Sequence, residues 1–376
     1  MTRRLSRPRR AARVTVMVAA LTLAGLLAGC AVAAPTTTTE PTAPVGPRVP
    51  LSDVIVAENP RDITGPSTAL MSSTTIDPVS RDPAQSLPVT VVSRDLDIDR
   101  AVVVTDASRV LALDIAGSLA ATVFALGFGD TLIGRDISTT FPEAATLPVV
   151  TSSGHAISSE AVLALRPTLV ITDGTVGPTD VVLQLREAGV TVVYVDAEPG
   201  LAAPAELARQ VSAALGSPET GELLAERLEL ELTAVLADIA VIAPTEPADR
   251  VRIVFLYLRG SSGIYYLFGE ESGADELIKG LGGIDVASEI GWKGLRPMTD
   301  EALIAANPDL ILVMTDGLES VSGVDGLIAE KPAVGLTRAG ENRRFVDMAD
   351  GEMLSFGPRT PLVLDALARA IYAPEP

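Results

Sequence analysis

Histidine and cysteine, the side chains that most often ligate metals or act as nucleophiles, are scarce in this 376-residue sequence. There is one histidine, His155, and one cysteine, Cys30, so a site that needs several histidines cannot be built and no intramolecular disulfide can form. The sequence has no G-x-S-x-G elbow and no Walker loop. What remains is a lone imidazole, a lone thiol and a Tyr-x-Arg pair, Tyr257 and Arg259. This set favours ligand binding over catalysis, and we expect no enzyme activity.

The Tyr-x-Arg pair ends a predicted strand that begins near residue 251. Residues two apart on a strand share a face, so Tyr257 and Arg259 point the same way. They do so at a carboxyl end, the edge where α/β sheets bind ligands. An adjacent guanidinium favours a phenolate. The alternative is a core tyrosine with a satisfied hydroxyl. Tyr265 and Tyr266 are rivals for the same role, and as strand neighbours they face opposite ways.

Alternating strands and helices must position these residues. They predict an α/β fold with a parallel-sheet N-terminal lobe at 99–216. Its strands are expected at 101–104, 109–113, 132–134, 169–171 and 190–195, and its helices at 117–126, 160–165 and 181–188. A long helix at 217–243 links it to a C-terminal lobe at 244–376. There the strands are expected at 251–257, 310–313 and 345–348, and the helices at 276–281, 302–306 and 362–371.

The two lobes echo one another in sequence. Glu160 and Pro167 are seven residues apart, as are Glu301 and Pro308, and an apolar strand ending at Asp-Gly follows each pair. Each Glu falls in the first turn of a predicted short helix, where its charge complements the helix dipole. This is a two-copy repeat rather than a solenoid.

The N-terminal residues predict an export signal. Six arginines precede an apolar run of about 14 residues, too short for a membrane span, which needs about 20. Residues 27–30 read Leu-Ala-Gly-Cys, which resembles a lipobox. We therefore predict a lipoprotein signal peptide at 1–29, a lipidated Cys30 and a flexible Pro/Thr/Ser-rich tether at 30–98. The alternative is an ordinary signal peptide followed by a buried thiol.

The charge balance excludes some partners. The net charge is −19, and removing the six N-terminal arginines leaves −19 − 6 = −25. Such acidity argues against nucleic acid and against adsorption to anionic lipid by charge alone. We expect an extracytoplasmic monomer held at the membrane by its lipid.

Residues 109–134 and the two Glu-to-Pro segments together resemble helical-backbone metal receptors, the type III periplasmic-binding-protein class, over about 109–373. The first segment has Pro167-Thr168 where that class usually has Pro-Asp. The resemblance implies two Rossmann-like lobes joined by one long helix, with the ligand in the cleft between them. It also implies delivery to an ABC importer, a permease dimer with its ATPase, with Glu160 and Glu301 meeting one permease subunit each. For both glutamates the alternative is a simple helix-start acid.

The Tyr-x-Arg pair with a histidine in the other lobe resembles actinobacterial haem-importer receptors. Ferric haem takes a tyrosinate or an imidazole as axial ligand. The resemblance implies haem as the transported ligand, His155 and Tyr257 as its axial ligands and Arg259 as hydrogen-bond donor to the phenolate. Three further residues lie in loops expected at the cleft, namely Trp292, Arg296 and Arg359. The alternative is a ferric-siderophore or cobalamin receptor, and a solvated His155. Zinc or manganese would need more His and carboxylate ligands.

Overall fold

The computed structural model describes residues 48–95, 98–152 and 154–374. The predicted signal peptide, Cys30 and the first part of the predicted tether lie outside these residues. Within the described ranges, no helix combines the length and the apolar character that a membrane span needs.

The N-terminal lobe is built on three parallel strands in the order β4 (Val110–Leu113), β5 (Leu169–Thr172) and β6 (Thr191–Tyr194). All of their residues are buried except Thr191, which explains the continuous apolar runs in the sequence. Four helices accompany the sheet, namely α1 (Ser118–Val123), α2 (Ser159–Leu165), α3 (Thr179–Glu187) and α4 (Ala203–Ala214). The strand predicted at 132–134 is only an isolated bridge between Leu132 and Val110.

The C-terminal lobe has a mixed sheet. Four strands run parallel, β1 (Ser67–Thr68), β12 (Phe345–Met348), β11 (Leu310–Met314) and β7 (Arg252–Arg259), and the short β9 (Ile284–Asp285) pairs with β7. Beyond β7 the sheet continues antiparallel through β8 (Ile264–Phe268) and β10 (Leu295–Pro297). Its helices are α6 (Ala274–Gly280), α7 (Val286–Glu289), α8 (Asp300–Ala306), α9 (Thr315–Glu319), α10 (Gly323–Glu330), α11 (Pro332–Gly335), α12 (Arg338–Glu341) and α13 (Thr360–Tyr372).

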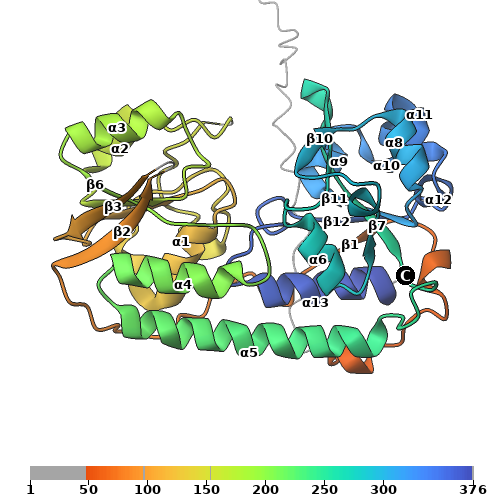
Figure 1. The fold of residues 1–376 in the computed structure, drawn as a ribbon, viewed down its shortest axis with the longest axis horizontal. Coiled ribbons are helices and arrows are strands. Elements are labelled where there is room, and N and C mark those ends of the chain that lie inside the picture. The colour runs from red at the N-terminus through yellow and green to blue at the C-terminus, as the bar shows by residue number, and fades with distance from the viewer. Residues whose placement is uncertain (1–47, 96–97, 153, 375–376) are drawn as a thin grey trace, which may run out of the picture. The chain divides into compact units, whose positions relative to one another are not determined.

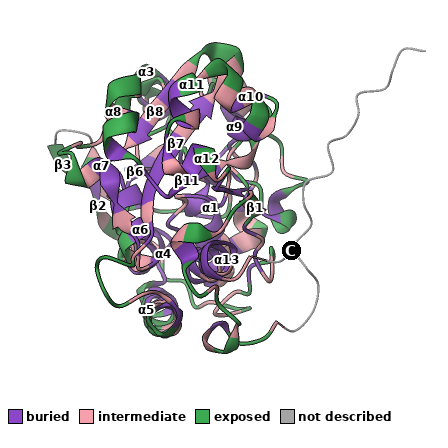
Figure 2. Cartoon of the chain, turned by 90° about the vertical axis from the view of Figure 1, so that its right-hand side faces the viewer, coloured by how far each residue is buried: buried purple, intermediate pink, exposed green. Residues whose placement is uncertain are grey.

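The long helix α5 (Pro218–Ile242) belongs to both lobes (Figure 1). At 1.5 Å per residue it is about 37 Å long. Leu224 and Leu228 on its first half join the core of the N-terminal lobe, whereas Val235 and Ile239 on its second half join the core of the C-terminal lobe. In Figure 2, α13 is coloured as buried above α5. The prediction of two lobes joined by one long helix is confirmed.

The predicted tether is wrong for residues 48–95. Leu51 is only 2% exposed and packs in the core of the C-terminal lobe, and β1 pairs with β12 at the edge of that lobe's sheet. Further along, β2 (Val89–Asp95) pairs antiparallel with β3 (Ile98–Val104). This hairpin joins the N-terminal lobe through an ion pair between Asp95 and Arg186. Both lobes therefore include chain that precedes residue 99.

Candidate functional site

Tyr257 and Arg259 lie at the carboxyl end of β7, half-buried, as the sequence predicts. The Arg259 guanidinium carbon lies 4.7 Å from the centroid of the Tyr257 ring, so the cation stacks over the ring face. Nη1 of Arg259 donates to the Leu258 carbonyl at 2.9 Å, and Nη2 donates to Oδ2 of Asp350. The guanidinium is thus held over the phenol ring by a carboxylate two residues beyond β12.

Asp350 ties together the carboxyl ends of three neighbouring strands. Its Oδ2 accepts from Arg259 after β7, and its Oδ1 accepts from the backbone N–H of Asp316 after β11 at 3.0 Å. Burial raises the pKa of Asp350 above the ordinary aspartate value, whereas the positive charge of Arg259 opposes that rise. Sequence reasoning missed Asp350. The signal that could have found it is its position: Asp350 follows a buried strand, and α/β sheets bind ligands at the carboxyl ends of their strands.

The antiparallel register of β7 and β8 decides between the rival tyrosines. Tyr266 lies directly opposite Tyr257 and shares its face, and the Phe268 ring stacks on Tyr257 with centroids 6.0 Å apart. Tyr265 points to the other face, where its hydroxyl donates to Glu330 at 2.5 Å. Burial and this glutamate raise the pKa of Tyr265 to about 12. Tyr265 is therefore a core residue, and only Tyr266 accompanies Tyr257.

His155 lies in the N-terminal lobe, in a loop closed by the bridge between Thr151 and Ile157. It has a left-handed backbone with φ 57°, a conformation that His adopts more readily than most residues. Its backbone N–H donates to the Ser152 carbonyl at 2.9 Å. Its Nδ1 lies 3.5 Å from Oγ of Ser138. The half-buried imidazole therefore has one polar neighbour on its Nδ1 side.

A buried pair of carboxylates supports the loop that carries Ser138. Asp136 accepts from the backbone N–H of Thr139 at 2.7 Å and from that of Asp114 at 3.3 Å. Asp114 is fully buried and accepts from Ser118 at the start of α1. Burial, together with the negative charges of Asp136 and Asp173, raises the pKa of Asp114 to about 8. Among the residues the structure describes, no group of three or more His, Cys, Asp or Glu side chains is arranged to hold a metal ion.

The two lobes meet beside these residues. A Cβ built on Gly351 would lie 2.3 Å from Oγ1 of Thr140 and 3.1 Å from the Ser138 carbonyl oxygen, so a larger residue would displace the Thr140 side chain. Gly351 follows Asp350, the partner of Arg259, and Ser138 neighbours His155. The loop that carries His155 and the stacked pair of Tyr257 and Arg259 thus both lie near this contact between the lobes, which we call the seam.

The three further residues expected at the cleft differ in whether their side chains are free to contact a ligand. Arg359 is 7% exposed and forms an ion pair with Glu352, and its guanidinium carbon lies 5.9 Å from the Phe141 ring of the other lobe. It joins the lobes rather than presenting a free cation. Trp292 packs against the core of the C-terminal lobe, and Arg296 lies exposed on β10.

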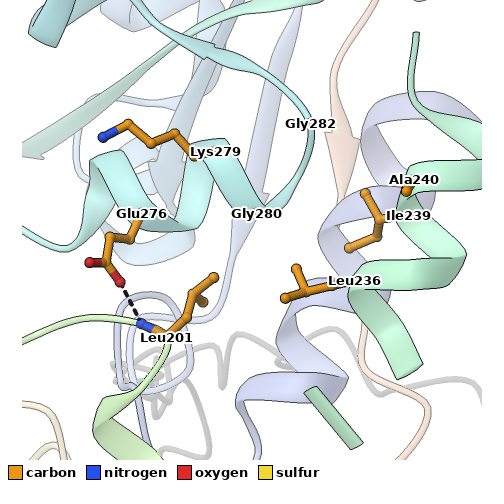
Figure 3. Close-up of a pocket in the computed structure, with 8 residues that line it drawn as sticks. All are labelled: Leu201, Leu236, Ile239, Ala240, Glu276, Lys279, Gly280 and Gly282. Atoms are coloured by element: carbon orange, nitrogen blue, oxygen red, sulfur yellow. Dashed lines mark hydrogen bonds between the residues drawn. The ribbon is translucent and has the colours of Figure 1, made fainter. Parts of the chain in front are cut away.

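A hollow of about 450 Å³ lies elsewhere, between α5, α6 and the segment before α4 (Figure 3). Its lining is mostly apolar, with Leu236 and Ile239 from α5. Glu276 of α6 accepts from the backbone N–H of Leu201 at 2.8 Å, which joins the lobes at this point. Neither His155 nor Tyr257 lines this hollow.

Comparison with known proteins places the chain. A model of the periplasmic binding protein family matches residues 115–350. The haem-binding protein HmuT is 38% identical over 84% of this chain and 99% of HmuT, with a TM-score of 0.78. Periplasmic haem-binding protein RhuT from Roseiflexus sp. RS-1 is also 38% identical, over 71% of this chain and 98% of RhuT, with a TM-score of 0.64.

A third solved structure, periplasmic haem-binding protein BhuT in complex with two haems, is 32% identical over 70% of this chain and 97% of BhuT, with a TM-score of 0.61. None of the curated proteins compared matches the chain. The family model spans more than half of the sequence, and the fold described above has the two lobes that the similar structures share. The chain belongs to the periplasmic binding protein family.

Proposed function

We propose that this protein captures haem outside the cytoplasm and delivers it to an ABC importer, with His155 and Tyr257 as the axial ligands of the iron. One observation carries the proposal. A histidine loop and a Tyr-x-Arg pair, one from each lobe, approach the same seam in a chain 38% identical to a haem-binding protein. Solved HmuT variants replace a histidine, a tyrosine and an arginine with alanine, and that arginine also follows its tyrosine by two positions.

The chemistry of the residues supports this ligand. A phenolate and an imidazole are both axial ligands of ferric haem. The guanidinium of Arg259 lies 4.7 Å from the centroid of the Tyr257 ring, where its positive charge would attract an iron-bound phenolate. The solved relatives are binding proteins, and nothing in this proposal requires catalysis. Titration with hemin tests it, because a stoichiometric complex with a shifted Soret band is expected, whereas a siderophore or cobalamin receptor would leave the hemin spectrum unchanged.

Anchoring through Cys30 is a separate part of the proposal. Its support is the Leu-Ala-Gly-Cys sequence at 27–30, and Cys30 is the sole cysteine. We expect Cys30→Ala to lose its lipid and to leave the membrane fraction, because a chain with net charge −19 has little electrostatic affinity for anionic lipid. Fractionation in high salt without detergent measures this. A Cys30→Ala protein that stays in the membrane fraction would show that another element anchors the chain.

Delivery requires a docking face, and we propose that Glu160 and Glu301 provide it. Both are exposed in the first turn of a short helix, α2 in one lobe and α8 in the other. One acidic residue per lobe is what a dimeric permease with one basic residue per subunit requires. Replacing both with Ala should leave hemin binding unchanged while uptake through the cognate importer falls.

Ionic strength makes this test specific. Exposed charges at the rim of an interface mainly govern the association rate, so the uptake defect should shrink as salt rises and screens the wild-type attraction. Haem-dependent growth at limiting hemin measures uptake. Growth of the double variant at the wild-type rate, with equal protein levels, would exclude a necessary docking role.

A further inference from the structure

The helices that carry Glu160 and Glu301 are near copies in three dimensions. Each has seven residues, and each is capped by a hydroxyl, Ser158 or Thr299, that accepts from a backbone N–H at 3.3 Å. Each ends in a left-handed residue, Arg166 with φ 49° or Asn307 with φ 42°. The repeat seen in the sequence is therefore preserved as a pair of matching surface elements.

Both copies also expose an aliphatic side chain three residues after the glutamate. Leu163 is 39% exposed on α2 and Ile304 is 42% exposed on α8, whereas the residues just before them, Val162 and Leu303, are fully buried. Residues three apart lie on the same side of a helix, so each aliphatic side chain lies beside its glutamate. Figure 1 shows α2 and α8 on the side of their lobes that faces away from α5.

We propose that Leu163 and Ile304 are the apolar anchors of a twofold docking surface for a dimeric membrane permease. Each permease subunit would present a basic side chain beside a shallow apolar pocket. The proposal rests on delivery to an ABC importer, as proposed above, and it extends the docking face on which Glu160 and Glu301 lie. A single exposed aliphatic residue needs no explanation. The same residue class at the same position of two matching helices, one in each lobe, is what a partner with two equivalent halves would recognise.

The two residue types have different tasks at such a surface. The glutamates act at a distance and raise the rate of encounter, an effect that salt screens. The aliphatic side chains act only in contact, where burial of apolar surface slows dissociation and depends little on salt. Association and dissociation rates therefore report the two contributions separately.

The experiment uses the full-length, hemin-loaded protein and its cognate permease–ATPase complex in lipid nanodiscs. Leu163→Gln and Ile304→Gln are combined, because Gln preserves helix propensity and removes the apolar contact. The control combines Leu223→Gln and Leu230→Gln on α5, where the leucines are 55% and 72% exposed. We expect the anchor variant to dissociate about tenfold faster at both low and high salt, and each single variant roughly threefold faster. The control should match the wild type.

The dissociation rate of the anchor variant decides whether Leu163 and Ile304 are anchors. An anchor variant that dissociates as slowly as the wild type overturns it, even if the double glutamate variant associates more slowly and the docking role of the glutamates stands. Equal acceleration in the α5 control also overturns it, because the effect would then be general to exposed leucines. If the glutamate variant associates normally and the anchor variant still dissociates faster, the anchors stand and the charged docking role fails. Unchanged hemin spectra and thermal midpoints verify that the variants fold.

Discussion

Tyr257→Phe should abolish the tyrosinate-to-iron charge-transfer band of the ferric hemin complex. The substitution removes one oxygen and preserves the ring that stacks on Phe268 and lies under Arg259. Loss of a partner that only orients a ligand lowers metal affinity roughly 10–100-fold. Loss of the ligand itself should therefore lower hemin affinity by at least about 100-fold, measured by hemin transfer to a haem-free acceptor protein.

The chain offers a matched control for this substitution. Tyr266 lies opposite Tyr257 on the same face of β7 and β8, so Tyr266→Phe removes the same atom from the adjacent position. It should leave the charge-transfer band in place. His155→Ala should instead change the coordination of the iron and weaken binding less, because the phenolate remains. A ferric spectrum unchanged by Tyr257→Phe, or a band lost in Tyr266→Phe, would remove Tyr257 from the coordination sphere.

Sequence patterns predicted the architecture where periodicity is strong. The helix expected at 217–243 is present as α5, and the buried strands of both lobes appear close to their predicted positions. Prediction failed where an element is stabilised only by distant chain. Ser67–Thr68 forms a strand because it pairs with β12, and Leu51 is buried because the C-terminal lobe covers it. Both lie among Pro, Ser and Thr residues, whose composition indicates a tether.

In the candidate site, too, local sequence patterns predicted some features, whereas contacts between distant parts of the chain were not predicted. Strand polarity predicted that Tyr257 and Arg259 share a face at a carboxyl edge, and they do. The sequence did not reveal that Arg259 stacks over the ring and pairs with Asp350, which lies 91 residues further along the chain. Strand order in the sheet determines that contact. The seam between Gly351 and Ser138 is likewise a product of tertiary packing and has no local signature.

The buried carboxylates that support the loop carrying Ser138 should make the protein less stable as the pH rises. Burial and the negative charges of Asp136 and Asp173 raise the pKa of Asp114 from 3.8 to about 8, and burial raises the pKa values of Asp136 and Asp173 as well. Between pH 3.8 and about pH 8, Asp114 holds a proton in the folded protein that it has released in the unfolded chain. The unfolding free energy therefore falls with rising pH, by at most about 1.4 kcal/mol per pH unit for one group. This contribution is complete below about pH 4 and is lost as the pH passes through 8.

Asp173→Asn should flatten this decline. Oδ1 of Asp173 accepts from the backbone N–H and the hydroxyl of Thr175, and the amide oxygen of Asn preserves both bonds. The variant loses one of the two negative charges that raise the pKa of Asp114, and it also loses the titration of Asp173 itself, so less stability is lost between pH 5 and pH 8. Urea unfolding at each pH unit measures the slope. Asp180 is exposed on α3, so Asp180→Asn removes the same formal charge at the surface and should retain the wild-type slope. Equal slopes in all three proteins would show that the charge of Asp173 does not raise the pKa of Asp114.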